Sequence, residues 1–280
     1  MKIKTNGIML ALYLALTSLA LKAQDTLKVT NIEAILYSGS SNNQPLVIGL
    51  GGSEGGNAWT SNYWKTTREE FVARGYAFLA IGYFGCRGTP KILDRIAIDD
   101  VYKAIKTAQN HQKINKEKVA IVGGSRGADL ALLLASYYKD INCVIAMSAS
   151  HAVFPGHTQN FNTSCWKFEG NELPFIPVND AAVPFLIKGD LSSAFEAMLL
   201  DTIAEKQSLI KVEKINGAIL LLTGKADEII PATAMAQKMV SKLKENKFKY
   251  PYQHIAFEGS HAEPTKHFDV IFKFLDKNFL

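Results

Sequence analysis

VAIVGGSRGADLALLLAS, residues 119–136, carries the strongest indication of the fold in this chain. Its first four residues form a short, continuous apolar run, which is typical of a strand covered on both faces. The apolar spacing from Ala128 onward is that of a helix. Gly123-Gly124-Ser125-Arg126-Gly127 connects the two directly. A G-x-S-x-G segment in this setting predicts a sharp turn that holds the serine in a strained conformation with its hydroxyl exposed, so we predict a nucleophile at Ser125.

The same alternation of short apolar runs and amphipathic stretches continues on both sides of this segment, which indicates strand–helix units in a mostly parallel sheet. Their near-continuous apolar character predicts strands with helices on both faces of the sheet. The predicted strands are Leu46–Leu50, Tyr76–Ile81, Val119–Val122, Cys143–Met147, Ala218–Leu222 and Gln253–Phe257.

The amphipathic stretches predict five helices, and Gly75 and Pro231 stand where a helix typically ends or begins. Ahead of this pattern, Leu27–Thr30 and Ile32–Tyr37 predict an antiparallel pair at the sheet edge. The predicted helices are Trp64–Arg74, Ile96–Gln109, Ala128–Tyr138, Thr233–Lys244 and Phe268–Asn278.

One interval, about residues 151–215, is far longer than a usual connection between elements and is rich in Phe, Pro and Asn. This composition favours a lid over an apolar pocket, and the alternative is an irregular excursion with a surface helix at Ser193–Ile203. His151 also follows a strand end, where it is able to line such a pocket. The candidate pocket residues are Glu54, Phe154, His157, Trp166 and Phe168.

A serine hydroxyl becomes a good nucleophile when an imidazole takes its proton and a carboxylate orients that imidazole. The chain carries both groups on loops after later predicted strands, Asp227 on the first and His261 on the next. Loops at the carboxyl ends of neighbouring parallel strands converge. Glu228 is the alternative acid, and the spacing from the strand favours Asp227. The order Ser, Asp, His is the one expected of an α/β-hydrolase.

The negative oxygen that forms when a serine attacks a carbonyl needs two hydrogen-bond donors. We predict the backbone N–H of Arg126 as one donor, and the N–H of Ser53, with that of Glu54 as the next choice, as the other. Ser53 lies in the glycine-rich segment Gly51–Gly56, where a phosphate cradle is the less favoured interpretation. The Arg126 side chain is able to steer an anionic group, although a surface salt bridge is the commoner role for such a residue.

The first residues predict a removable leader. Lys2 and Lys4 precede an apolar run that is too short to span a membrane but long enough for a signal-peptide core. We expect a signal peptide over residues 1–23, cleaved between Ala20 and Gln24, and a single domain over residues 24–280. The protein is then secreted or periplasmic, with no membrane span after the leader is removed.

The composition narrows the partners further. The chain has 280 residues, 48% of them hydrophobic, and 31 Lys and Arg against 26 Asp and Glu. Three of those lysines lie in the leader, so the remaining charge is close to balance and does not suggest a nucleic-acid partner. Cys143 is expected to be a buried apolar residue, and nothing favours pairing of Cys86 with Cys165 over free thiols. No metal-ligand spacing occurs, and we expect no metal and no cofactor.

Five segments together resemble the catalytic C-terminal domain shared by acyl-CoA thioesterases and bile acid-CoA:amino acid N-acyltransferases. This resemblance covers most of residues 45–280 and implies an α/β-hydrolase fold with Ser125 as nucleophile, Asp227 as acid and His261 as base. It also implies a small-molecule ester or thioester as substrate. The five segments are Gly49–Gly56, Gly75–Tyr83, Val119–Ser136, Ile215–Pro231 and Lys247–His261.

The chain departs from that family in two respects. The family usually carries a β-rich domain ahead of the hydrolase, and too few residues lie between the expected leader and Leu46 for one here. The leader also implies a compartment where acyl-CoA is scarce. The family's acyltransferase branch typically uses Cys as nucleophile, so Ser125 favours water as the acyl acceptor. Prolyl-oligopeptidase-like peptidases usually have a second glycine where Ala128 stands. We therefore expect a secreted serine hydrolase of esters or thioesters. The alternatives are a peptidase, an acyltransferase and a non-catalytic binding protein with the hydrolase fold.

Overall fold

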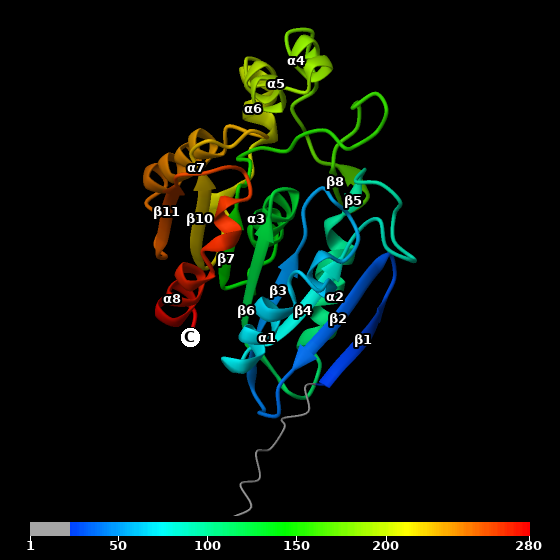
Figure 1. The fold of residues 1–280 in the computed structure, drawn as a ribbon, viewed down its shortest axis with the longest axis vertical. Helices are drawn as coiled ribbons and strands as arrows, with labels where there is room; N and C mark the ends of the chain where they lie inside the picture. The colour runs from blue at the N-terminus through cyan, green and yellow to red at the C-terminus, as the bar shows by residue number, and fades with distance from the viewer. Residues whose placement is uncertain (1–22) are drawn as a thin grey trace, which may run out of the picture.

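A sheet of eight strands runs through the centre of the computed structural model, which describes residues 23–280 (Figure 1). The strands lie in the order β1-β2-β4-β3-β6-β7-β10-β11. β1 and β2 are antiparallel to their neighbours, and the other six run parallel to one another. The bounds are β1 Ala23–Val29, β2 Ile32–Ser38, β3 Gln44–Leu50, β4 Ala77–Gly82, β6 Ile114–Gly124, β7 Cys143–Met147, β10 Ala218–Gly224 and β11 Tyr252–Phe257.

The predicted strands and the antiparallel pair at the edge are confirmed, although the ends of several strands differ from the prediction by one to five residues, with the largest difference in β6. β6 begins at Ile114, five residues before the predicted start at Val119. Its first part pairs with Gln44 and Pro45, and the register shifts before the pairing of Leu46 with Val119. The polar residues in this first part lack the apolar run that marks a strand covered on both faces, so the pattern indicated only the buried half.

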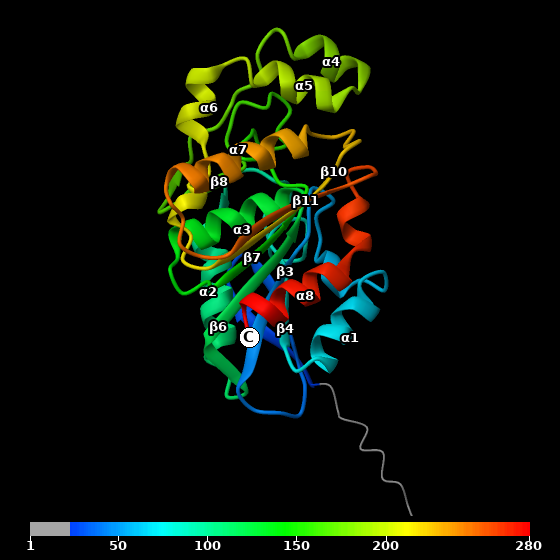
Figure 2. The same cartoon turned by 90° about the vertical axis from the view of Figure 1, so that its left-hand side faces the viewer.

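Helices cover both faces of the sheet, as predicted. α1 and α8 pack on one face through residues such as Phe71 and Phe272, whereas α2, α3 and α7 pack on the other through residues such as Val101, Leu132 and Met239. Figure 2 shows the two layers on opposite sides of the strands. The bounds are α1 Lys65–Ala73, α2 Ile98–Gln109, α3 Arg126–Tyr137, α7 Ala232–Glu245 and α8 Phe268–Asn278, with short 3-10 helices at Ala58–Thr60, Val212–Lys214 and Glu263–Lys266.

The long interval, residues 151–215, forms a structured segment that we call the cap. Its helices lie together at the top of Figure 1. They share an apolar cluster with the start of α7 that includes Phe154, Met198 and Met235. The cap elements are β8 Trp166–Phe168 and β9 Asn171–Glu172, which form a small sheet with β5 Ile96–Ala97, and the helices α4 Val183–Lys188, α5 Leu191–Met198 and α6 Thr202–Ser208.

The alternative interpretation placed a single surface helix at Ser193–Ile203, and this was wrong. The chain instead leaves α5 after Met198 and starts α6 at Thr202. The Asp201 carboxylate accepts the Ala204 N–H at 2.9 Å, and such a cap satisfies a donor that the first turn of a helix leaves free. The aspartate therefore begins a new helix within an apolar stretch that resembles one continuous helix.

Three further sequence predictions concern the cysteines, a membrane span and the leader. Cys143 is buried as predicted, and Cys86, Cys143 and Cys165 are all free thiols, so the possible pair does not form. Within residues 23–280, no helix is long and apolar enough to cross a membrane. The predicted leader lies almost wholly outside the described residues.

Candidate active site

The predicted turn brings Ser125 out between β6 and α3. Its backbone has φ 53° and ψ −125°, a conformation that residues with a side chain rarely adopt. The turn is held on both sides, because the Ser125 N–H donates to the Met147 carbonyl at 2.8 Å and the Ser125 carbonyl accepts the Ala128 N–H at 2.8 Å. Strain of this kind persists only where the surrounding structure fixes it, and it gathers at functional sites.

The outer glycines of the turn are required by close backbone approach. A Cβ atom on Gly123 would lie 2.2 Å from the Gly127 carbonyl oxygen, and a Cβ on Gly127 would lie 2.2 Å from the Gly51 carbonyl oxygen. Both contacts are with backbone, which cannot rotate away as a side chain can. Gly124 differs from both, because a Cβ there would meet only the Met147 methyl group at 3.8 Å.

This difference predicts that Gly127→Ala lowers the free energy of unfolding by about 3 kcal/mol or more, because the added methyl group displaces the backbone at Gly51. Gly124→Ala is the matched control, and its free energy of unfolding should stay close to that of the wild type. Urea denaturation of the three proteins measures both changes. Equal stability of the two variants would contradict the steric account of the turn.

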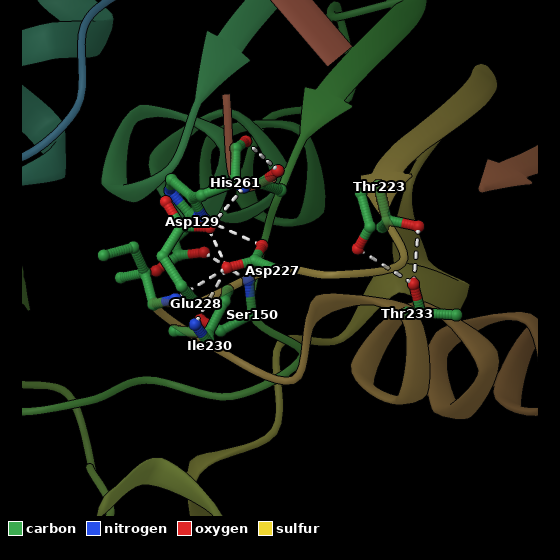
Figure 3. A network of polar contacts seen from close by, with 11 residues as sticks. Asp129, Ser150, Thr223, Asp227, Glu228, Ile230, Thr233 and His261 are labelled. Carbon is green, nitrogen blue, oxygen red and sulfur yellow. Dashed lines mark hydrogen bonds and ion pairs between the residues drawn. The ribbon is translucent and has the colours of Figure 1, made fainter. Parts of the chain in front are cut away.

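The imidazole of His261 is paired with Asp227, the acid favoured by the sequence. The distances from His261 Nδ1 to the two carboxylate oxygens are 2.8 and 2.9 Å, and the pair is visible in Figure 3. The Asp227 side chain is only 2% exposed and also accepts the backbone N–H groups of Ile229 and Ile230. These bonds fix the carboxylate, so it is able to hold the imidazole in one orientation with Nε2 directed away from it.

Two other residues hold the backbone of His261. Glu228 accepts the His261 N–H at 2.9 Å, so this competing acid contacts the main chain of the histidine and not its ring. Ser148 Oγ donates to the His261 carbonyl at 2.7 Å. Ser148 also has a positive φ of 52°. Ser148 was not among the predicted site residues, and the one available signal was its position directly after the strand that ends at Met147.

Ser125 and His261 both line one cavity of about 470 Å³ beneath the cap. Ser125 Oγ makes no hydrogen bond to any residue of the described range 23–280. Such contacts are often long in a ligand-free site and tighten when a substrate is bound. The cavity wall is mainly apolar and comes largely from the cap and the loop before α7, through Pro155, Phe161, Val178, Leu186, Leu191, Phe195, Met198, Ile229 and Ile230.

The predicted pocket residues separate into two groups. Glu54 and His157 line the cavity. Phe154, Trp166 and Phe168 do not, because the first two are fully buried in apolar clusters and Phe168 packs against Tyr137 and Tyr138. His151 lines a different cavity, where its Nε2 lies 2.6 Å from Glu205. The aromatic composition of the cap therefore reflects its own core as much as the pocket.

Both predicted oxyanion donors lie at the cavity. Ser53 and Arg126 line it together with Ser125. Within residues 23–280, neither the Ser53 nor the Arg126 backbone N–H donates to another group. The neighbouring Gly52 N–H is already taken by Glu54 Oε1 at 3.0 Å. The backbone N–H of Glu54, the next choice, likewise donates to no group in this range, so the identity of the second donor stays a prediction.

The Arg126 side chain is buried and does not form the surface salt bridge that is common for such a residue. Its Nη1 lies 3.3 Å from Asp129 Oδ2, and the two side chains are 11% and 3% exposed. The other carboxylate oxygen of Asp129 accepts the Ser150 N–H at 2.8 Å. Burial raises the pKa of Asp129 to about 6, although Arg126 and the Ser150 hydrogen bonds act to lower it.

No group of three or more His, Cys, Asp or Glu side chains within residues 23–280 is arranged to hold a metal ion. The chemistry that the described residues support is nucleophilic attack by a hydroxyl on a carbonyl, with a carboxylate-oriented imidazole as base.

Comparison with known proteins finds a matching family model and several relatives. A family model described as "BAAT / Acyl-CoA thioester hydrolase C terminal" matches residues 100–262, more than half of the chain. Acyl-coenzyme A amino acid N-acyltransferase 2 of Mus musculus is 23% identical over 62% of this chain and 40% of its own length. Acyl-coenzyme A thioesterase 1 of Rattus norvegicus is 25% identical over 69% of this chain and 44% of its own length. The chain thus spans less than half the length of these two curated relatives.

Solved structures show the same fold. An esterase of Pyrococcus furiosus aligns with a TM-score of 0.62 and 15% identity over 92% of each chain. An acylaminoacyl peptidase of Pyrococcus horikoshii aligns with a TM-score of 0.66 and 12% identity over 92% of this chain and 41% of its own. At these identities the likeness establishes the architecture alone, and it confirms the predicted α/β-hydrolase fold.

Proposed function

The chain belongs to the BAAT / acyl-CoA thioester hydrolase C-terminal family, and from this premise we propose that it is a serine hydrolase that cleaves a carboxylic ester or thioester. The single observation that carries the proposal is the pairing of His261 Nδ1 with the buried Asp227 carboxylate, at a cavity that also contains Ser125. A family whose relatives are named for thioester hydrolysis and acyl transfer is consistent with acyl chemistry at that serine.

The proposed reaction begins with attack of Ser125 Oγ on the carbonyl carbon of the substrate. His261 Nε2 takes the hydroxyl proton, and Asp227 stabilises the resulting imidazolium. The backbone N–H groups of Ser53 and Arg126 hold the developing negative oxygen. His261 then protonates the leaving alkoxide or thiolate. Water, activated by the same imidazole, finally releases the acid from the acyl-serine.

Acyl transfer to an amine is the second candidate, because one of the relatives is named as an amino acid N-acyltransferase. The two reactions share the acyl-serine and differ only in the molecule that resolves it. We propose hydrolysis as the main reaction, since the resemblance associates the transferase branch with cysteine and this chain has Ser125.

A substrate panel tests the proposal. Purified protein is offered an aryl ester, an acyl-CoA thioester and a peptide with the same acyl group, each with and without a primary amine such as glycine. We expect release of free acid from the ester or thioester, with the peptide cleaved most slowly. Faster cleavage of the peptide would favour a peptidase, and an N-acyl product formed in place of free acid would favour a transferase.

Export is also part of the proposal. The charged start, the apolar run and the small residues before Gln24 support a leader of 23 residues. Fractionation of the producing cell, followed by N-terminal sequencing of the purified protein, tests it. A mature protein that begins between residues 21 and 25 outside the cytoplasm is expected, and an intact leader on cytoplasmic protein would contradict it.

A further inference from the structure

Arg126 presents a positive charge to the cavity with most of its hydrogen-bonding capacity unused. A guanidinium has five N–H donors, and the described residues provide Arg126 with one hydrogen bond, from Nη1 to Asp129 at 3.3 Å. No Arg126 nitrogen is among the fully enclosed polar atoms of residues 23–280 that lack a hydrogen-bond partner. The Arg126 nitrogens without a partner therefore keep some exposed surface. Because Arg126 lines the cavity, its remaining donors face that space.

The surroundings of the guanidinium suit an anion. The rings of Phe154 and Phe195 lie 5.7 Å from its central carbon and exclude water from its flanks. Burial and the charge of Arg126 lower the pKa of His157, so this neighbour is neutral near pH 7. An anion that enters the cavity therefore meets a poorly solvated guanidinium that is paired with Asp129 on one edge, and charge-assisted hydrogen bonds to its other edge are strong in such a setting.

Asp129 contacts this cation and Glu54 lines the same cavity, and neither carboxylate occupies the second edge of the guanidinium. Asp129 occupies one edge of the guanidinium and is itself held by the Ser150 N–H, so it fixes the position of Arg126. Glu54 lines the same cavity, but its Oε1 is bound to the Gly52 N–H at 3.0 Å. Neither forms the two parallel bonds by which a guanidinium typically binds a carboxylate.

The position of the cation relative to the reacting atom limits the ligand. Arg126 directly follows Ser125, and consecutive Cα atoms are about 3.8 Å apart. Ser125 and Arg126 also line the same cavity, so an acyl group attached to Ser125 shares one bounded space with the guanidinium, and this space favours a short chain. The cavity of about 470 Å³ has room for such a chain.

We propose that Arg126 binds a carboxylate carried by the substrate, so that the preferred ester or thioester is formed from a short dicarboxylic acid. This inference rests on the proposed function, since it specifies the acyl group that is cleaved. The carboxylate occupies the free edge of the guanidinium, opposite Asp129, while the ester carbonyl lies at Ser125.

Matched pairs of substrates test the inference. Mono-p-nitrophenyl esters of glutarate, adipate and suberate are each compared with the same ester whose distal carboxylate is capped as a methyl ester. In the wild type, kcat/KM for the best charged ester should exceed that for its capped twin by about 10- to 100-fold, the range expected for a charge-assisted hydrogen bond. Arg126→Gln should abolish this preference. Arg126→Lys should retain only part of it, because an ammonium lacks the planar fork.

Arg87→Gln is the control, since Arg87 is exposed and its loss changes the net charge equally. This variant should keep the wild-type preference. A further pair is 4-carboxyphenyl acetate and phenyl acetate. The first carries its charge on the leaving phenol and not on the acyl group. A preference that depends on Arg126 in this pair alone would place the carboxylate on the leaving group and would overturn the assignment to the acyl group. Equal kcat/KM within every pair, or a preference that survives Arg126→Gln, would overturn the inference.

A binding measurement separates this inference from the proposed function. Calorimetric titration of Ser125→Ala protein with monomethyl adipate and with dimethyl adipate needs no turnover. Tighter binding of the monomethyl ester, whose distal carboxylate is free, that is lost when Arg126→Gln is added supports the carboxylate site even if no ester is hydrolysed. Equal binding of the two ligands overturns it, even if ester hydrolysis by the wild type upholds the proposed function.

Discussion

Ser125→Ala is expected to lower kcat/KM for the best ester or thioester substrate by about 10⁴-fold or more. The variant keeps the oxyanion donors and the cavity, but it removes the atom that forms the acyl-enzyme. Removal of one member of such a group costs nearly as much as removal of all, because the members act as a unit. Initial rates measured over a range of substrate concentrations provide the comparison.

Ser61→Ala is a suitable control for this variant, because Ser61 is exposed and lies outside the cavity. It should retain wild-type activity. The thermal unfolding midpoints of both variants should match that of the wild type, since Ser125 Oγ makes no hydrogen bond within residues 23–280. A loss of less than about tenfold in the Ser125 variant would mean that another group attacks the carbonyl.

Asp227→Asn should lower kcat/KM by about 10⁴-fold, because an amide favours the wrong tautomer of His261 and cannot stabilise its charged form. The asparagine oxygen is still able to accept the N–H groups of Ile229 and Ile230, so the loop should remain folded. The effect therefore reports on the imidazole. The measurement is kcat/KM as a function of pH, with circular dichroism to check the fold.

Glu228→Gln is the matched control for Asp227→Asn. It makes the same chemical change one residue later, on a side chain that contacts the His261 backbone N–H and not its ring. A glutamine oxygen still accepts that N–H, so we expect a loss of less than about tenfold. If Glu228→Gln proved as damaging as Asp227→Asn, the assignment of the acid would be wrong.

The sequence predicted the core of the fold and the place of the site for a shared physical reason. Strands covered on both faces have nearly continuous apolar runs, and helices with one buried face have amphipathic ones, so β7 and α8 were bounded correctly from sequence. Parallel strands bring the loops at their carboxyl ends together, which is why Asp227 and His261 were expected to meet. Neither inference needed knowledge of distant contacts.

The cap could not be predicted in the same way, because its structure depends on contacts between distant residues. Phe154 and Trp166 were expected at the pocket, but both are enclosed by cap and core residues that the local sequence does not specify. The burial of Arg126 has the same origin. Asp129 lies three residues after Arg126 on the same helix, whereas Phe195 contacts the Arg126 guanidinium from α5.

Labelling with a fluorophosphonate tests most directly whether Ser125 is an activated nucleophile. The wild-type protein should gain one covalent adduct by intact mass spectrometry, and peptide analysis should place it on Ser125. His261→Ala should slow its formation by several orders of magnitude, because the hydroxyl then lacks its base. An adduct on any other residue, or undiminished labelling of the Ser125→Ala protein, would contradict the account.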